Sequence, residues 1–331
     1  MDTKRVFIKA KQVLLKQKAV LAILAMLILM LFFNTQFYSV YNWMNVFRSA
    51  TVQGIIAMGV TMTVLCAACD LSVGGIMCLS GVITVLMINS GMPIAVACLC
   101  ALLAGAAVGL VNGFLVVHQR TEPFIITLGM GTLLKGICQQ LTDAHPIACT
   151  NMEFMKISNT KIFGQIPILV LYMAVILVIF FCVLRFTTYG RNCYAIGGNY
   201  DVAKYSGINT VMIKWSTFVI SGVMAALAGI LLSSRMNSAS SVYGDNTGML
   251  VNCGVVIGGT SFAGGIGGVV QSFIGVFVLQ LMSNCMDCLG IGAYVQQLLQ
   301  GIIIVLILPS KKAGACISKG ETDYERDSES I

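Results

Sequence analysis

Few side chains of this 331-residue chain have the types and spacing that catalysis or metal binding requires. Its thirteen cysteines include two C-x-x-C pairs, Cys66 with Cys69 and Cys285 with Cys288, a spacing that can bind a metal or form a disulfide. The first pair lies within an apolar run and the second near the end of one, and cysteine in such places packs as a small polarizable residue. We favour packing for both pairs. No Ser-His-Asp set, H-E-x-x-H motif or paired carboxylates indicate a membrane-bound enzyme.

Asp70 is the only acidic residue that falls inside a long apolar run away from polar loops. A charged side chain at the centre of a bilayer costs about 2.5–3.5 kcal/mol on insertion scales, so Asp70 should face protein or water. It could fix a break between two membrane spans or contact a translocation route. It could instead lie solvated at a helix end and cap the next helix, and we favour this cap. No second buried acid or histidine accompanies it to form a proton relay.

A glycine-rich run follows late in the chain and contains Gly258, Gly259, Gly264 and Gly265. A phosphate-binding P-loop requires G-x-x-x-x-G-K-[ST], and the sequence contains no Gly-Lys-Ser or Gly-Lys-Thr. Close packing of helices through small residues explains the glycines better. We therefore expect no ATPase activity and no enzyme activity from this chain. Any ATP hydrolysis on which it depends belongs to another protein.

The elements that carry these residues are long and apolar. Hydrophobic residues make up 57% of the chain and charged residues 10%, with a mean hydropathy of +0.89. Apolar runs of this length cross a hydrocarbon layer of about 30 Å as helices, because lipid offers no partner for backbone polar groups. We predict an all-α transmembrane bundle. Its ten candidate spans are 19–33, 50–69, 71–89, 93–117, 123–141, 166–184, 212–234, 248–262, 265–283 and 289–308. The second and third could equally form one broken or re-entrant pair, so we expect eight to ten crossings.

The placement of the positive charge predicts the orientation. With ten crossings and the N-terminus inside, fifteen of the twenty Lys and Arg lie in inner segments, as the positive-inside rule requires. The net charge of +7 therefore indicates a membrane partner and no nucleic acid. We expect a multi-pass protein of the cell (inner) membrane with a basic cytoplasmic segment at 1–18, a membrane domain at 19–308 and a disordered cytoplasmic tail at 309–331. A signal peptide fits less well, because no small-residue cleavage site follows Phe33.

A polar segment from Arg185 to about Ile213 interrupts the apolar pattern in mid-chain. Asn199 is a favourable N-cap, residues 200–206 form one or two helical turns, and Gly207 suits the position after the helix. A short amphipathic helix between two spans on the cytoplasmic side either docks on a partner protein or lies on lipid headgroups. We favour docking on a partner.

An ordered series of short motifs resembles the permease subunits of ribose-, xylose- and galactose-type ABC sugar importers, within the branched inner-membrane permease superfamily. The resemblance covers roughly residues 50–308. Its motifs in the membrane spans include Ser221-Gly222 and the structural or translocation candidates Asp70, Ser72, Gly74, Asn112, Gly113, Pro123, Phe124, Thr127, Gly258, Gly259, Thr260, Gly264 and Gly265. Its motifs in the polar segment are Ala195, Ile196, Gly197, Gly198, Asn199, Ala203, Ser206, Gly207 and Ile208.

The resemblance implies a permease that moves a monosaccharide across the membrane. It further implies a second permease chain, identical or related, and an extracytoplasmic sugar-binding protein. A cytoplasmic ATPase would bind ATP and Mg²⁺, so this chain would hold no cofactor, and residues 195–208 would be the helix that couples it to that ATPase. An ion- or proton-coupled transporter is the alternative, disfavoured because acids and bases are nearly missing from the spans. The family usually has a more acidic, Glu-containing stretch before the glycine-rich run. In residues 243–252 of this chain, Asp245 is the only acidic residue.

Overall fold

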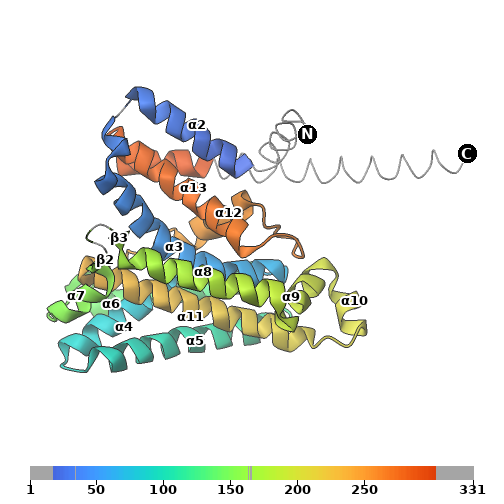
Figure 1. Cartoon of the computed structure of the whole chain (residues 1–331). Helices are drawn as coiled ribbons and strands as arrows, with labels where there is room; N and C mark the ends of the chain where they lie inside the picture. Colours follow the sequence, from blue (N-terminus) through green and yellow to red (C-terminus); the bar gives the residue numbers. More distant parts are fainter. Residues whose placement is uncertain (1–17, 34, 163, 165, 303–331) are drawn as a thin grey trace, which may run out of the picture. The chain divides into compact units, whose positions relative to one another are not determined.

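The computed structural model describes residues 18–33, 35–162, 164 and 166–302, and these are mostly helical (Figure 1). The chain divides into two compact units, residues 1–282 and 283–331. The helices of the first unit are α2 (Lys18–Phe33), the 3-10 helix η1 (Thr35–Tyr38), α3 (Val40–Leu65), α4 (Val73–Asn89), α5 (Ile94–His118), α6 (Pro123–Thr142), α7 (Met152–Asn159), α8 (Ile168–Phe186), α9 (Thr188–Gly198), α10 (Tyr200–Tyr205), α11 (Thr210–Met236) and α12 (Thr247–Gly258). The last helix, α13 (Val269–Cys288), begins in the first unit and ends in the second.

Four two-residue strands hold the connections between helices. Strand β1 (Ile147–Ala148) pairs antiparallel with β4 (Ser238–Ala239), and β2 (Lys161–Ile162) pairs antiparallel with β3 (Ile166–Pro167). Next to the first pair, the Cys149 amide donates to the Asn237 carbonyl at 2.9 Å. The β1–β4 pair fastens the segment between α6 and α7 to the end of α11, and the β2–β3 pair closes the turn between α7 and α8.

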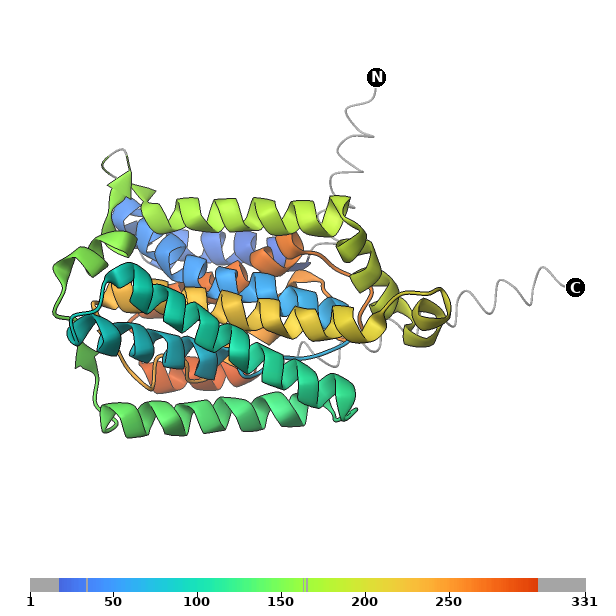
Figure 2. The ribbon, with the colours of Figure 1, turned by 90° about the horizontal axis from the view of Figure 1, so that it is seen from below.

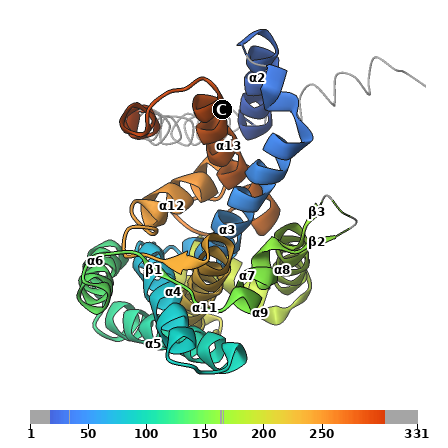
Figure 3. The ribbon, with the colours of Figure 1, turned by 90° about the vertical axis from the view of Figure 1, so that its left-hand side faces the viewer.

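Helix α11 is central to the first unit. It packs against α3, α4 and α5 (Figure 2 and Figure 3). Of its most apolar stretch 61% is buried, compared with 17% for that of α6. Small residues allow the closest of these approaches. A Cβ atom on Gly222 of α11 would collide with the Gly105 carbonyl of α5, and one on Gly105 would collide with the Gly222 carbonyl. Helices in lipid associate through such backbone proximity, because hydrocarbon provides no hydrophobic driving force between them.

Among the described residues, five helices are long and apolar enough to cross a membrane: α5, α6, α8, α11 and α13. Helix α3 has 26 residues, but its first half is more polar and includes Arg48, and the apolar helix α4 has 17 residues. The predicted all-α polytopic architecture is therefore confirmed. The predicted number of eight to ten crossings stays a prediction.

Two predicted spans are wrong in their extent. The span at 248–262 is the 12-residue helix α12, about 18 Å long and too short to cross the hydrocarbon layer alone. It ends because Gly259 adopts φ +122°, which L side chains rarely reach. The span at 50–69 starts earlier, at Val40, and ends at Leu65. Apart from Lys18, the predicted basic segment lies outside the described residues, as do residues 303–308 of the last predicted span and the predicted tail at 309–331.

Candidate functional site

The non-helical residues 66–72 separate α3 from α4 and contain Asp70. The side chain of Asp70 is fully buried, so the predicted solvated cap is wrong. One carboxylate oxygen accepts from the Ser72 amide at 3.0 Å and from the Ser72 hydroxyl at 2.6 Å, and the other accepts from the Ser221 hydroxyl of α11 at 2.7 Å. A carboxylate can be buried when donors replace its water shell, as these three do. Asp70 thus orders the residues that lead into α4 and attaches them to α11.

Two asparagines extend this polar network to further helices. Asn112 of α5 donates to the Ser72 hydroxyl at 2.8 Å, and Asn252 of α12 donates to the backbone carbonyl of Asp70 at 2.8 Å. The structure therefore brings the candidates Asp70, Ser72 and Asn112 together. The sequence had indicated Ser221 only through a small-residue motif, and nothing in it had pointed to Asn252. The Asn112 side-chain oxygen is buried and has no hydrogen-bond partner in the described part of the chain.

Three candidates at the start of α6 are placed differently from one another. Pro123 is the first residue of α6, where its missing amide hydrogen costs nothing. Thr127 is buried and its hydroxyl donates to the Pro123 carbonyl at 2.8 Å, with the Cys69 carbonyl also 3.4 Å away. Phe124, by contrast, is 56% exposed. Thr127 therefore packs α6 against the break beside Asp70, whereas Phe124 does not join the polar network.

The glycine-rich loop at 259–268 connects α12 to α13 and lies against the end of α3. The Gly265 amide donates to the carbonyl of Leu65, the last residue of α3, at 3.0 Å. Thr260 is buried, with its hydroxyl 2.9 Å from the Ser272 hydroxyl of α13. Gly258 packs against the backbone of Gln271 in α13. The glycines of this loop therefore allow close backbone packing, as the sequence predicted.

The polar segment in mid-chain forms α9 and α10, which lie at one end of the first unit (Figure 1). The Asn199 side chain accepts from the Asp201 and Val202 amides, both at 3.1 Å, and thus caps α10. Gly207 follows the helix at φ +82° and donates to the Lys204 carbonyl at 3.1 Å. The Ile208 amide donates to the Ala203 carbonyl at 3.2 Å, which completes a Schellman motif. The predicted start and stop of this helix are confirmed.

The end of α9 touches both the glycine-rich loop and the end of α3. A Cβ atom on Gly197 would collide with the Leu65 carbonyl and with the backbone of Gly264 and Gly265. We call Gly197, Gly264 and Gly265 the glycine junction. The other candidates of this segment are split by burial: Ile196 and Ala203 face the core, whereas Ala195, Gly198 and Ser206 lie on the surface. Backbone contact therefore joins α9, the α3 end and the α12–α13 loop at one point.

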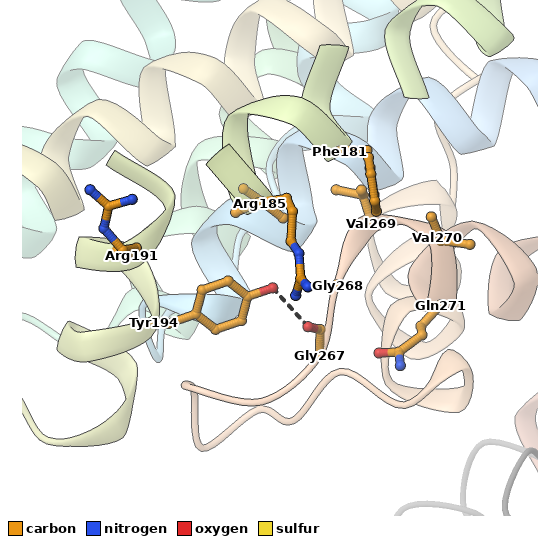
Figure 4. Close-up of a pocket in the computed structure, with 10 residues that line it drawn as sticks. Phe181, Arg185, Arg191, Tyr194, Gly267, Gly268, Val269, Val270 and Gln271 are labelled. Carbon is orange, nitrogen blue, oxygen red and sulfur yellow. Dashed lines mark hydrogen bonds between the residues drawn. The ribbon is translucent and has the colours of Figure 1, made fainter. Parts of the chain in front are cut away.

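A cavity of about 450 Å³ lies beside the glycine junction (Figure 4). At its edge the Tyr194 hydroxyl of α9 donates to the Gly267 carbonyl at 2.8 Å. Burial raises the pKa of Tyr194, so this hydroxyl remains a donor at neutral pH. Arg185 extends toward Gly268, while the guanidinium of Arg191 turns away from it (Figure 4). The Tyr194 hydrogen bond is thus a second link between α9 and the glycine-rich loop.

The remaining candidates pack against neighbouring backbone or rings. Gly74 of α4 lies so close to Gly244 that neither could carry a Cβ atom, and Gly113 of α5 packs against the Trp215 ring. Cys66 and Cys285, from the two C-x-x-C pairs, are 1% and 7% exposed. The cysteines of the described residues form no disulfide, and no group of three metal-ligating side chains occurs in that part of the chain.

A second cavity, of about 470 Å³, lies between α4, α6 and residues 241–249. Its lining includes Lys135 and Asp245, which form an ion pair at 2.7 Å. Asp245 is the single acid of the stretch where the chain departs from the family pattern. The sequence had given no partner for it.

The family described as the permease component of the branched-chain amino acid transport system matches residues 42–308. The chain is 33% identical to the ribose import permease protein RbsC of Haemophilus influenzae over 297 residues, 88% of this chain and 92% of that protein. It is 33% identical to the D-allose transport system permease protein AlsC of Escherichia coli, over 81% of this chain and 82% of that protein. The autoinducer 2 import system permease protein LsrC of Photorhabdus luminescens is 32% identical, over 88% of this chain and 87% of that protein.

No solved structure matches this one. The family match covers most of the chain, and the relatives align over more than four fifths of their own lengths. The helical, multi-span architecture agrees with a permease, since five of the described helices can cross a membrane. The chain therefore belongs to this family of transport-system permeases and is a multi-pass membrane protein.

Proposed function

We propose that this chain is the permease subunit of an ABC importer that moves a monosaccharide into the cell. A separate ATPase would drive it, an extracytoplasmic binding protein would deliver the sugar, and a second permease chain would complete the membrane part. The observation that carries the proposal is the α9–α10 element, which presents an exposed surface at one end and is locked onto the membrane helices at its base. Relatives named for ribose and D-allose import support a monosaccharide as the solute.

The exposed surface of α10 supports docking on a partner protein. Tyr205 is 88% exposed, Val202 60% and Tyr200 41%. A six-residue helix would not be stable alone, because the conformational entropy lost in forming the first turn exceeds the free energy gained from so few hydrogen bonds. The caps at the two ends of α10 must therefore stabilise it. Aromatic and apolar side chains displayed on such a preformed element are typical of interface anchors. We assign this surface to the ATPase, and we propose that the α10 end and both termini face the cytosol.

The base of the element supports coupling. Gly197 contacts the end of α3 and the glycine-rich loop without any intervening side chain. Packed backbone transmits displacement better than flexible side chains do, because protein interiors are close-packed and yield little. Closure of the ATPase would therefore move the α3 end and the α12–α13 loop together, beside the break that Asp70 anchors.

Copurification tests this docking surface. We expect the double substitution Val202→Asp and Tyr205→Ala to reduce ATPase recovery with the permease by tenfold or more, since losing interface anchors costs about 2 kcal/mol or more. Tyr41→Ala is the matched control, because Tyr41 is 77% exposed on α3 and outside the surface. Unchanged ATPase recovery with the double variant would contradict the docking assignment. Sugar uptake that persists without the ATPase and follows a proton or sodium gradient would favour an ion-coupled transporter.

A further inference from the structure

An ion pair joins a membrane helix to the segment that precedes α12. Lys135 lies within α6, seven residues before its end at Thr142, or about 10 Å along the helix axis. An ionisable residue within an apolar span is costly unless it faces a partner or water, and such residues often mark solute pathways. Lys135 has its partner in Asp245, yet the two side chains remain 40% and 41% exposed. The surrounding protein does not cover this ion pair completely, so the two side chains face an open space.

The opening is the cavity of about 470 Å³ between α4, α6 and residues 241–249. Glycine backbone forms much of its lining, at Gly74, Gly131 and Gly244 among others, so polar peptide groups are within reach there. Phe124 of α6 supplies an apolar wall. Its volume lies in the range of about 300–1,000 Å³ that is usual for small-molecule sites.

A serine adds a further polar side chain to the lining of this cavity. Ser241 lines the cavity and is 2% exposed. Its backbone carbonyl accepts from the Cys78 thiol at 3.4 Å, which holds this residue against α4. Its hydroxyl therefore adds one group to the lining that can both donate and accept a hydrogen bond.

We propose that this cavity is a contact site for the transported sugar, with Lys135 and Asp245 as its hydrogen-bonding groups. This inference rests on the proposed function. One hydroxyl of a monosaccharide can donate to the Asp245 carboxylate while its neighbour accepts from the Lys135 ammonium, and the Ser241 hydroxyl can donate or accept. The apolar side of the sugar ring fits the Phe124 wall. The pair then positions two adjacent hydroxyl groups of the sugar.

The test compares sugars as well as variants. The complete complex, with its ATPase and binding protein, is placed in proteoliposomes, and ATP-driven uptake of D-ribose, D-allose and 2-deoxy-D-ribose is measured at saturating sugar. We expect the wild type to take up a hydroxylated sugar at least tenfold faster than its deoxy counterpart, because hydrogen bonds to charged groups contribute about 1.5–3 kcal/mol. Asp245→Asn and Lys135→Met should bring that ratio close to one. Glu153→Gln is the control, since Glu153 pairs with Lys156 in an exposed ion pair on α7.

A charge-swapped variant separates sugar contact from a structural role. Lys135→Asp combined with Asp245→Lys restores an ion pair, so a merely structural pair would recover both thermal stability and the wild-type uptake ratio. If the pair contacts sugar, stability recovers while the ratio stays altered. Wild-type uptake with a ratio that none of these variants changes would overturn this inference alone. Failure of the wild-type complex to take up any of the three sugars in an ATP-dependent way would overturn the proposed function and the inference together.

Discussion

Two adjacent glycines at the end of α9 differ sharply in their surroundings, and this difference gives a demanding test of coupling. A methyl group on Gly197 would collide with the Leu65 carbonyl and would lie 2.9 Å from the Gly264 carbonyl carbon. A methyl group on Gly198 would have no atom within 4 Å. The substitutions Gly197→Ala and Gly198→Ala thus add the same methyl group at two adjacent positions. At Gly197 the space is occupied by neighbouring backbone, and at Gly198 it is open.

The structure allows the two costs to be estimated. Overpacking at Gly197 costs about 1–3 kcal/mol. If the loop shifts to relieve the collision, the 3.0 Å hydrogen bond from Gly265 to Leu65 is also lost, at about 0.5–1.5 kcal/mol. Alanine recovers about 0.5–1 kcal/mol relative to glycine within a helix. We expect Gly197→Ala to destabilise the junction by roughly 2 kcal/mol in net terms, and Gly198→Ala to be neutral or slightly stabilising.

Two measurements check this expectation. Size-exclusion chromatography of heated, detergent-purified protein should show a lower melting temperature for Gly197→Ala than for Gly198→Ala. In the reconstituted complex, Gly197→Ala should also lower the amount of sugar taken up per ATP hydrolysed, because a displaced loop no longer moves with α9. Equal stability and equal uptake per ATP for the two variants would refute the glycine junction as a point of coupling.

Two further predictions concern the anchor and the cap. Asp70→Asn keeps the side-chain size but replaces one of the two acceptor oxygens with an NH2 group, so one of the two buried serine hydroxyls loses its acceptor. The expected loss of stability is about 1–3 kcal/mol. Heated size-exclusion should register this loss, and a melting temperature equal to that of the surface variant Ser206→Ala would contradict it. Gly207→Ala forces a side chain into φ +82°, at a cost of about 1–2 kcal/mol. We expect α10 to fray and ATPase recovery to fall, and full recovery would show that the Schellman turn does not hold the docking surface.

The parts of the structure that depend on local chemistry could be predicted from the sequence. The bounds of α10 follow from an asparagine that caps the first turn and a glycine that ends the last one, and both signals lie within nine residues. The long apolar helices α5, α6, α8 and α11 follow from length and hydropathy alone. In these elements the residues of the segment itself, through their capping groups, length and hydropathy, decide the structure.

The surroundings of Asp70 could not be predicted in this way. Its burial depends on the Ser221 hydroxyl, which lies 151 residues away in the chain, and on Asn252, which lies 182 residues away. A lone acid in an apolar run is compatible with solvent or with buried donors, and only the packing of α11 and α12 selects between them. The short α12 was also missed, because its apolar run continues past the helix. The pair Gly258-Gly259 was the one local sign that the helix stops there.

The two sides of the break between α3 and α4 are held by different interactions, and this difference suggests how motion would pass through it. On the α4 side, Asp70 is fixed by side-chain hydrogen bonds to α11, and Asn252 attaches α12 to the same point. On the α3 side, Leu65 is held by backbone contact with the loop that leads into α13. A displacement of α9 would therefore carry the α3 end and the start of α13, while α12 stays with the Asp70 anchor. The resulting shear falls on residues 259–268, where glycines with positive φ can absorb a change in backbone angles that other residues would resist.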